Sequence, residues 1–558
     1  MILFMKFQKN LYTTVLILVP VLLVYLCAHA SLVGILEDEV IYQETAESLA
    51  DHGTFTVDTL PGHPSITKYP PLYTCVLALV IKTTGFITPW MAQRAYILLQ
   101  CVITGLLAYW LLVVWGKRLG LSPLEQFFGM GAIFFNYHVL MVFASPMSEA
   151  LFMLFGVMLA YDSYPAQTMN KKRQGVICLL SAGLLLTRSI GISIIAGSAA
   201  AFFQRKQYRM LILLVVSTAC FMGILKIYQS SFVRPGQKAD MTAILSYYTS
   251  YHYHLVPYQN DFHRDGLIGL VNGIGMNAVH NLSNGVESLG EVLFPFYEES
   301  IKPSTNKPII PLIAGGIVGC LFILGLLLCK EGRYLLYFLI PYLGMLLVWT
   351  WPFTGRFWVP VLPLVILGLR GVLLRFDRMG RWLFYALCLS TMIMNLPFVV
   401  GRMSVAISSP DNHESVDKTD PLEVREYKEY LAWLKEKSSE QPKMILLGGM
   451  NTMQKARQYG VSGAWLEAMN GPEPFLMVSV GAQLTPEEME EERMKLALLL
   501  NKVASQFHDQ PVFVVSDFTL NKRYRSYLDT FSRENGGIAP VFVSESGNIR
   551  VYRLTPKI

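Results

Sequence analysis

The sequence predicts an α-helical membrane protein of about eleven transmembrane helices, followed by a small α/β domain outside the membrane. Hydrophobic residues make up 53% of the chain and charged residues only 15%, and the mean hydropathy is +0.40. Water-soluble domains carry about 25% charged residues, so the apolar part is no soluble globule. Apolar runs of about 20 residues, long enough to cross a bilayer as helices, recur up to about residue 400 and then stop. The chain therefore divides into a membrane domain, 1–400, and a polar domain, 401–558.

Basic residues between the apolar runs predict how the chain is oriented, because cytoplasmic loops are enriched in Lys and Arg. Lys6 and Lys9 precede the first run and place the N-terminus inside. The later basic clusters also fall inside if the chain crosses the membrane near residues 11–30, 95–115, 124–144, 149–166, 174–188, 190–204, 208–226, 309–329, 333–350, 358–374 and 382–400. Two long segments, 31–94 and 227–308, and the C-terminal domain then lie outside. The cysteines show neither a disulfide framework nor a zinc spacing, which favours a bacterial protein of the cytoplasmic (inner) membrane.

A cluster of acids follows the first span. The stretch "GILEDEVIYQETAESLADHG" (34–53) opens with the acids of 37–39, and its pattern predicts a short helix ended by Gly53. The residues "AHA" (28–30) resemble a signal-peptide cleavage site, but the apolar run continues to Leu36, longer than a typical signal core. We therefore expect a retained span with the acids at its outer mouth.

The rest of this first outside segment predicts a turn-rich connection and then a helix. Residues 54–73 are rich in proline, which predicts extended and turn structure. The stretch "PPLYTCVLALVIKTTGF" (70–86) is apolar but contains Lys82, and counting it as a span would put the next basic cluster outside. We therefore predict a helix that lies at the outer membrane interface.

The order of these features and of three later motifs resembles a known family. An acid pair, "DE" (38–39), follows the first span, and "KYPPLY" (68–73) leads into the interfacial helix. Then come "SPMSEALF" (145–152), "LLLTRSIG" (184–191) and an Arg-aromatic-x-x-Pro-x-x-Pro pattern in "TGRFWVPVLPLVILGL" (354–369). Over about residues 10–400 this order resembles the GT-C class of integral-membrane glycosyltransferases, in the bacterial branch that includes aminoarabinose transferases and protein O-mannosyltransferases. The resemblance implies inverting transfer of a sugar from a polyprenyl-phosphate donor to a hydroxyl of a lipid, glycan or protein acceptor on the outer face, without a cofactor.

The resemblance also implies roles for the acid pair. Transfer needs a base that takes the acceptor's proton and cations that receive the leaving phosphate. Asp38 matches the first position of the family's acid pair and is the expected general base. Glu39 is expected as the second catalytic acid, which orients the substrate. Such acids belong at the membrane mouth because the lipid fixes the donor's phosphate at the bilayer surface.

Three basic residues near the outer membrane boundary are expected to bind the donor phosphate: Arg356, Lys68 and Arg188. Arg356 is the first choice, because a cation beside an apolar run is costly unless it meets an anion. In the aminoarabinose branch the lysine immediately precedes the paired prolines, whereas here Tyr69 intervenes, so the match is incomplete at this position. The alternative for both arginines is a snorkelling side chain at a helix end.

Further candidates for binding the sugar or the acceptor are Glu149, Tyr69, Tyr42, His252 and His254. Glu149 is either a second acid of the site or an N-terminal cap partner of Ser148. The two histidines belong to "SYYTSYHYHLVPYQNDFHRDG" (246–266), whose rings either stack on sugars or form an interfacial aromatic belt. Their spacing indicates no metal, and no metal is expected.

The tail reads as a small α/β domain. "KMILLGG" (443–449) and "PVFVVSD" (511–517) predict buried strands, and "TPEE" (485–488) predicts a capped helix that runs to about Phe507. "APVFVSESGNIRVYRL" (539–554) predicts a hairpin. Neither strand is followed by a phosphate-binding glycine pattern, so we expect a domain that shapes acceptor access.

Two other classes of function stay open at this point. A transporter or lipid flippase would place acids near mid-membrane and often has paired broken helices in two halves. Here Asp38, Glu149 and Arg356 all fall near one boundary. An inactive relative whose tail binds a partner would show activity insensitive to Asp38. The expected partners of the enzyme are the polyprenyl-phosphate sugar, membrane lipids and an acceptor, with no nucleic acid.

Overall fold

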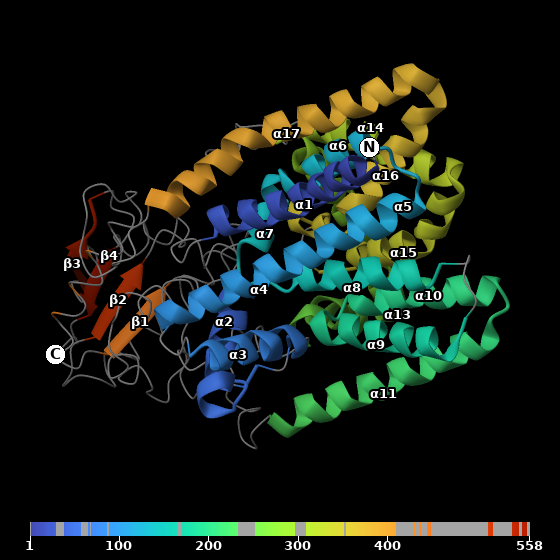
Figure 1. The fold of residues 1–558 in the computed structure, drawn as a ribbon. Coiled ribbons are helices and arrows are strands. Elements are labelled where there is room, and N and C mark those ends of the chain that lie inside the picture. The colour runs from blue at the N-terminus through green and yellow to red at the C-terminus, as the bar shows by residue number, and fades with distance from the viewer. Residues whose placement is uncertain are drawn as a thin grey trace.

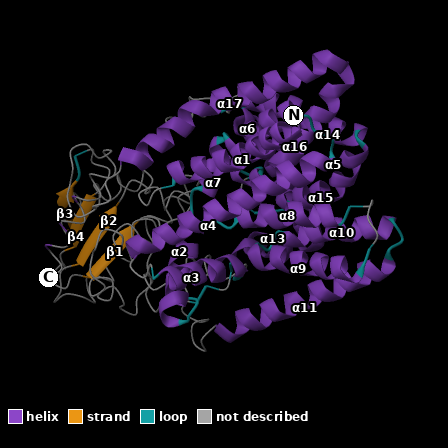
Figure 2. Ribbon diagram, viewed as in Figure 1, coloured by secondary structure: helices purple, strands orange, loops and turns teal. Residues whose placement is uncertain are grey.

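Helices make up most of the structure, and strands gather at one end (Figure 2). The computed structural model describes residues 2–28, 38–56, 65–66, 68–85, 89–164, 169–232, 252–295, 309–350 and 353–408, and in the tail 429, 433, 436, 443–447, 512–516, 538–545 and 550–554. The helices are α1 (Ile2–Cys27), α2 (Asp38–His52), α3 (Leu72–Thr84), α4 (Pro89–Tyr109), α5 (Gly116–Arg118), α6 (Pro123–Phe134), α7 (Tyr137–Phe143), α8 (Glu149–Asp162), α9 (Lys171–Thr187), α10 (Gly191–Gln204), α11 (Tyr208–Phe232), α13 (His252–Leu293), α14 (Ile309–Leu328), α15 (Lys330–Leu347), α16 (Leu362–Leu373) and α17 (Asp377–Ser408). A π-helical stretch, Trp110–Trp115, joins α4 to α5, and 3₁₀ turns at Gly355–Phe357 and Val359–Val361 precede α16.

Each of the predicted spans coincides with helical structure, but fewer helices qualify as spans by length and composition. Four described helical segments are long and apolar enough to cross a membrane: Arg94–Arg118, Tyr208–Ile227, Ile309–Leu328 and Gly355–Ser404. Helices α6 and α7 qualify only together and meet at a bend of 65°. Helices α8 and α10 have 14 residues each, fewer than the roughly 20 that a straight crossing needs. The described part is thus a multi-pass membrane protein with four or five candidate spans, and the count of eleven stays a prediction.

Arginines from three of the predicted inside loops meet at the C-terminal end of α8. The guanidinium of Arg118 lies 3.7 Å from the ring centroid of Tyr164, and Arg173 donates to the Tyr164 carbonyl at 3.2 Å. Arg205 donates to the Ser163 carbonyl at 2.7 Å. The structure thus places these basic loops at one end of the molecule, as the span prediction requires. Which compartment that end faces stays a prediction.

The first outside segment contains two short helices that pack on each other, α2 and α3. Helix α2 ends at Gly53, whose φ of 71° and N–H bond to the Leu49 carbonyl close it, which confirms the predicted helix and its end. Between the helices, the N–H of Ile66 donates to the carbonyl of Phe55 at 2.9 Å. The two helices lie at the same end of the molecule as the strands (Figure 1).

In the second outside segment the sequence analysis predicts no helix, yet the structure has one over residues 252–293. They form α13, with a single break at Asp265 and Gly266. Exposed apolar side chains such as Leu267 and Val271 alternate with polar ones along it. This mixture keeps the helix below the hydropathy of a membrane span, and the dense aromatic and His residues at its start obscured the helical spacing.

Glycines let α14 approach two neighbouring helices closely. A Cβ added at Gly315 would overlap the carbonyl oxygen of Val286 on α13, and one added at Gly325 would overlap that of Gly368 on α16. Small residues allow this close backbone packing between membrane helices. Helix α14 therefore packs closely on both α13 and α16; α13 contacts the turn that carries Arg356, and α16 follows that turn in the chain.

Gly325→Ala is expected to destabilise the protein by at least about 1–3 kcal/mol, because the added methyl meets backbone that cannot rotate away. The measurement is the midpoint of thermal unfolding in detergent. Gly223→Ala on α11 is the matched control, since a Cβ there has no neighbour within 4 Å. Equal midpoints for the two variants would contradict the close helix crossing.

The tail contains a four-stranded sheet in the order β1 (Lys443–Leu447), β2 (Val512–Ser516), β4 (Arg550–Leu554) and β3 (Ile538–Val543). Strand β1 pairs parallel with β2, in a register that sets Lys443 opposite Val512, and the other pairs are antiparallel. Both predicted apolar strands and the two arms of the predicted hairpin are therefore present. The hairpin turn and the helix expected from residue 485 lie outside the described residues, so the complete α/β domain stays a prediction.

Candidate active site

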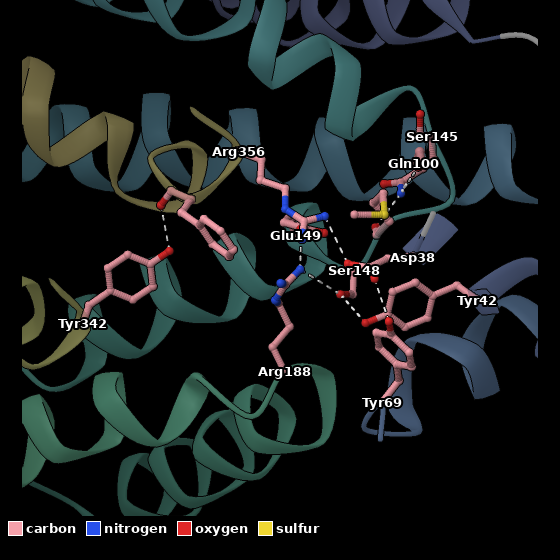
Figure 3. Close-up of polar contacts among 12 residues, drawn as sticks. Asp38, Tyr42, Tyr69, Gln100, Ser145, Ser148, Glu149, Arg188, Tyr342 and Arg356 are labelled. Atoms are coloured by element: carbon pink, nitrogen blue, oxygen red, sulfur yellow. Dashed lines mark hydrogen bonds and ion pairs between the residues drawn. The ribbon is translucent and has the colours of Figure 1, made fainter. Parts of the chain in front are cut away.

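A cavity of about 690 Å³ lies where α2, α8, α13, α15 and the turn at Arg356 meet. Its size is typical of a small-molecule site. Seven of the ten residues predicted for the site line it: Asp38, Tyr42, Lys68, Tyr69, Glu149, Arg188 and Arg356. Figure 3 shows side chains of this set converging from separate segments of the chain. The fold thus gathers in one place residues that the sequence had assigned only to the same membrane boundary.

Asp38 is the first residue of α2, a position where the helix dipole favours a carboxylate. Its Oδ2 accepts a hydrogen bond from Nη1 of Arg356 at 3.0 Å, and its Oδ1 accepts one from the hydroxyl of Tyr69 at 2.6 Å (Figure 3). Only 14% of the side chain is exposed. Burial by itself would raise the pKa of this carboxyl, but Arg356, Lys68 and the Tyr69 hydroxyl outweigh burial and hold the pKa below its ordinary value. Asp38 is therefore an ionised carboxylate with both oxygens engaged.

A second network joins α2, α8 and the end of α9. Nη1 of Arg188 forms an ion pair with Oε1 of Glu149 and lies 3.4 Å from Oγ of Ser148. The Ser148 Oγ is in turn 2.9 Å from the hydroxyl of Tyr42. Ser148 makes no side-chain cap bond to α8, so the capping alternative for Glu149 does not describe what its carboxylate does. Arg188 follows the last residue of α9, where the dipole favours a cation.

Lys68, a third cation of the cavity, lies beside a ring of a tyrosine cluster. Lys68 is buried, and its Nζ lies 5.4 Å from the ring centroid of Tyr69. The ring of Tyr42 packs edge-on against Tyr69 and Tyr73, with centroids 5.1 Å apart in each pair. Tyr69 therefore contacts three predicted site residues: Asp38 through its hydroxyl, and Lys68 and Tyr42 through its ring. These contacts make it a positioning residue for Asp38 as well as a candidate for touching substrate.

Three predicted residues stand outside this set. Glu39 follows Asp38 on α2, but successive side chains of a helix point in different directions, and the Glu39 side chain is fully buried and does not line the cavity. His252 and His254 begin α13, and their side chains lie outside the described part of the structure. Among the residues that the structure describes, no group of three or more His, Cys, Asp or Glu is placed to hold a metal ion.

Helix α13 fixes the backbone that leads to Arg356. The buried amide of Asn281 donates to the carbonyls of Leu346 and Trp349 at the end of α15 and accepts the N–H of Phe353 at 3.2 Å. Directly after the turn that carries Arg356, the indole of Trp358 donates to the carbonyl of Gly285 on α13 at 2.9 Å. Asn281 begins the sequon Asn-Leu-Ser, but its buried amide is committed to this backbone.

Comparison with known proteins gives similarities at low sequence identity. No protein-family model and no curated protein matches this sequence. The chain is similar to ArnT from Cupriavidus metallidurans. ArnT bound to undecaprenyl phosphate has 14% identity and a TM-score of 0.42, and ArnT in the apo state has 13% and 0.41, each over 98% of both chains. The arabinofuranosyltransferase AftD from Mycobacteria has 11% identity and a TM-score of 0.41, over 98% of this chain and 40% of AftD.

Sequence reasoning missed the wall of the cavity that α13 supplies. Asn284, Glu287, Ser288 and Glu291 all line the cavity. They are spaced i, i+3, i+4 and i+7, which places them on one face of the helix. Counting polar residues at helical spacing in "NLSNGVESLGEVLF" (281–294) would have revealed this stripe. The aromatic and His residues singled out from the sequence lie at the opposite end of the same segment.

Proposed function

We propose that this chain is a GT-C glycosyltransferase that transfers a sugar, with inversion, from a polyprenyl-phosphate donor to an acceptor hydroxyl on the outer face of the membrane. One observation carries the proposal: a single cavity joins the carboxylate of Asp38 to three cations, Lys68, Arg188 and Arg356. A base beside a cationic phosphate site is the arrangement that this transfer needs.

In the proposed reaction, the acceptor oxygen attacks the anomeric carbon of the donor sugar from the side opposite to the phosphate. The new bond joins the acceptor oxygen to that carbon, while the bond from the carbon to the phosphate oxygen breaks. The acceptor's proton passes to Asp38, and the electron pair of the broken bond leaves with the polyprenyl phosphate. Arg356 and Lys68 stabilise the negative charge that develops on the leaving oxygen. A single displacement of this kind inverts the anomeric configuration.

The polar stripe of α13 is the candidate surface for the sugar or the acceptor. Glu287 and Glu291 line the cavity together with the cations on the other segments. Carboxylates accept hydrogen bonds from hydroxyl groups, whereas a phosphate is attracted to the guanidinium and ammonium groups. The division of charge therefore favours a phosphate near Lys68 and Arg356, with hydroxyl-bearing groups toward α13.

The position of the charges favours an enzyme over a transporter or flippase. Glu149 is the first residue of α8, and Arg188 directly follows the last residue of α9. Asp38 is likewise the first residue of a helix. The cavity's charges thus gather at helix ends on one side of the membrane domain, whereas transport sites lie near the bilayer midplane.

The test is mass spectrometry of envelope glycans and lipids from a deletion strain complemented with wild type or with Asp38→Asn. The proposal expects a sugar-sized mass that appears with wild type and is missing with Asp38→Asn at equal protein level. That mass would identify the sugar and the acceptor together. A deletion that changes no glycan or lipid would instead move the transporter function ahead.

A second, apolar cavity adjoins the first. It has a volume of about 110 Å³ and shares Phe152 and Pro360 with the polar cavity. Apolar side chains such as Leu112 and Ile366 line it. A polyprenyl phosphate has a charged head joined to an apolar chain. The proposed donor therefore matches a charged cavity that adjoins an apolar one. We assign the apolar cavity to the first part of the prenyl chain.

Gly156→Leu is expected to weaken binding of undecaprenyl phosphate roughly tenfold, because the leucine would fill space that the chain occupies. Gly156 lines the apolar cavity, and a Cβ there meets nothing within 4 Å, so the fold can accept the larger residue. Titration of the purified protein with undecaprenyl phosphate gives the dissociation constant. Gly223→Leu on α11 is the control. Equal affinity for the two variants would contradict the assignment of the prenyl chain to this cavity.

A further inference from the structure

Arg356 is one of the three cations proposed to meet the donor phosphate, and in the structure it is paired with the proposed base. Its Nη1 lies 3.0 Å from Oδ2 of Asp38, across 318 residues of sequence. A quarter of the Arg356 side chain is exposed, toward the cavity that it lines. The same guanidinium therefore faces two anions in the proposed reaction, the carboxylate of Asp38 and the phosphate of the donor.

The two demands conflict while the pair is intact. A general base must bind the acceptor's proton strongly, but each oxygen of Asp38 already accepts a hydrogen bond, one from Tyr69 and one from Arg356. A carboxylate stabilised in this way is a weak base, since each hydrogen bond to its charged form disfavours protonation. The paired state therefore suits a resting enzyme better than a reacting one.

The surroundings allow Arg356 to change partner without a change of backbone. The turn Gly355–Phe357 is held by the hydroxyl of Tyr342, which donates to the Phe357 carbonyl at 2.8 Å, and by the indole of Trp358. The long side chain can rotate within the cavity while this backbone stays fixed. A phosphate offers a guanidinium a bidentate, charge-assisted contact, which makes it a strong competitor for a carboxylate that takes one bond.

We infer that the donor phosphate takes Arg356 from Asp38, so that donor binding itself frees the carboxylate to act as base. This exchange rests on the proposed function, because it assumes a phosphate-bearing donor in this cavity. No covalent bond changes in this step: the ion pair between Arg356 and Asp38 breaks, and an ion pair between Arg356 and the phosphate forms. Asp38 therefore becomes an effective base only when a donor is bound. In the empty site its carboxylate stays paired with Arg356 and is a weak base.

The exchange makes an unusual prediction for binding, namely that removing the proposed base should tighten it. In wild type, phosphate binding must break the pair between Arg356 and Asp38, and Asp38→Asn removes that cost. The expected gain in affinity for undecaprenyl phosphate is roughly tenfold, in line with a hydrogen bond between charged groups. Arg356→Ala should weaken binding, and adding Asp38→Asn to Arg356→Ala should then change affinity by less than about twofold.

The experiment measures dissociation constants of undecaprenyl phosphate for the purified full-length protein in nanodiscs, as wild type, the two single variants and the double variant. Asp51→Asn, an exposed carboxylate on the same helix, is the matched control. A cooperative unfolding transition in detergent, well above the temperature of the binding measurement, shows that each variant is folded.

Each other outcome overturns the exchange. An equal gain from Asp38→Asn with and without Arg356 would show simple repulsion between carboxylate and phosphate. Weaker binding by Asp38→Asn would show that Arg356 bridges both anions and needs Asp38 to orient it. Unchanged affinity would show that the pair never breaks. If wild type itself binds no undecaprenyl phosphate, the proposed donor class fails, and the exchange fails with it.

Discussion

Asp38→Asn is expected to lower sugar transfer by a factor of about 10²–10⁴ while leaving the fold intact, which is the range that a positioned general base contributes. The amide keeps the size of the carboxylate and can still accept a hydrogen bond from Tyr69, which now lies 2.6 Å from Oδ1. It cannot accept the acceptor's proton at neutral pH. The loss should therefore appear in kcat, since binding of the donor phosphate does not need this carboxylate.

The measurement is a time course of product formation in membranes with equal amounts of each variant, with the donor and acceptor identified by mass spectrometry. Asp51→Asn changes an exposed carboxylate at the far end of the same helix and should keep wild-type activity. Full transfer by Asp38→Asn would remove the base from the mechanism. Loss of transfer in both variants would point to damage to α2 as a whole.

The layer in which each site residue lies could be predicted from the sequence, but the contacts could not. Hydropathy and the basic loops predicted that Asp38 and Arg356 lie at one membrane boundary. This prediction limits their depth along the membrane normal but not their positions within the membrane plane. Their hydrogen bond depends on how the helices pack side by side, and glycine crossings such as that of Gly325 with Gly368 contribute to this packing. The sequence has no periodic pattern that identifies which helix packs against such a glycine.

The acid pair shows a second limit of sequence reasoning. A motif gives the order of Asp38 and Glu39, but the phase of α2 decides which of them faces the cavity, and only Asp38 lines it. The converse holds for α13, where helical spacing was present in the sequence but no helix was predicted. Its acidic stripe could have been predicted, whereas the burial of Glu39 depends on neighbours that are distant in sequence.

Arg188→Met is expected to destabilise the protein by about 3–5 kcal/mol, the usual cost of removing one partner of a buried ion pair. The pair joins Arg188 to Glu149, whose side chains are only 18% and 3% exposed. Apart from this ion pair, the described part of the structure gives neither carboxylate oxygen of Glu149 a hydrogen-bond partner. Arg188 therefore supplies most of the compensation for a buried charge, helped by the N-terminal dipole of α8.

A double variant separates this electrostatic effect from lost packing. Arg188→Met with Glu149→Gln removes both charges, so the protein should unfold at a higher temperature than Arg188→Met alone, although one more side chain has changed. Glu149→Gln by itself should cost less than Arg188→Met, because the guanidinium that remains borders the cavity and can reach water. Thermal unfolding in detergent gives all three midpoints. If Arg188→Met and the double variant unfold at the same temperature, Glu149 needs no counter-charge. Arg188 could then turn from Glu149 to the donor phosphate without lowering the stability of the protein.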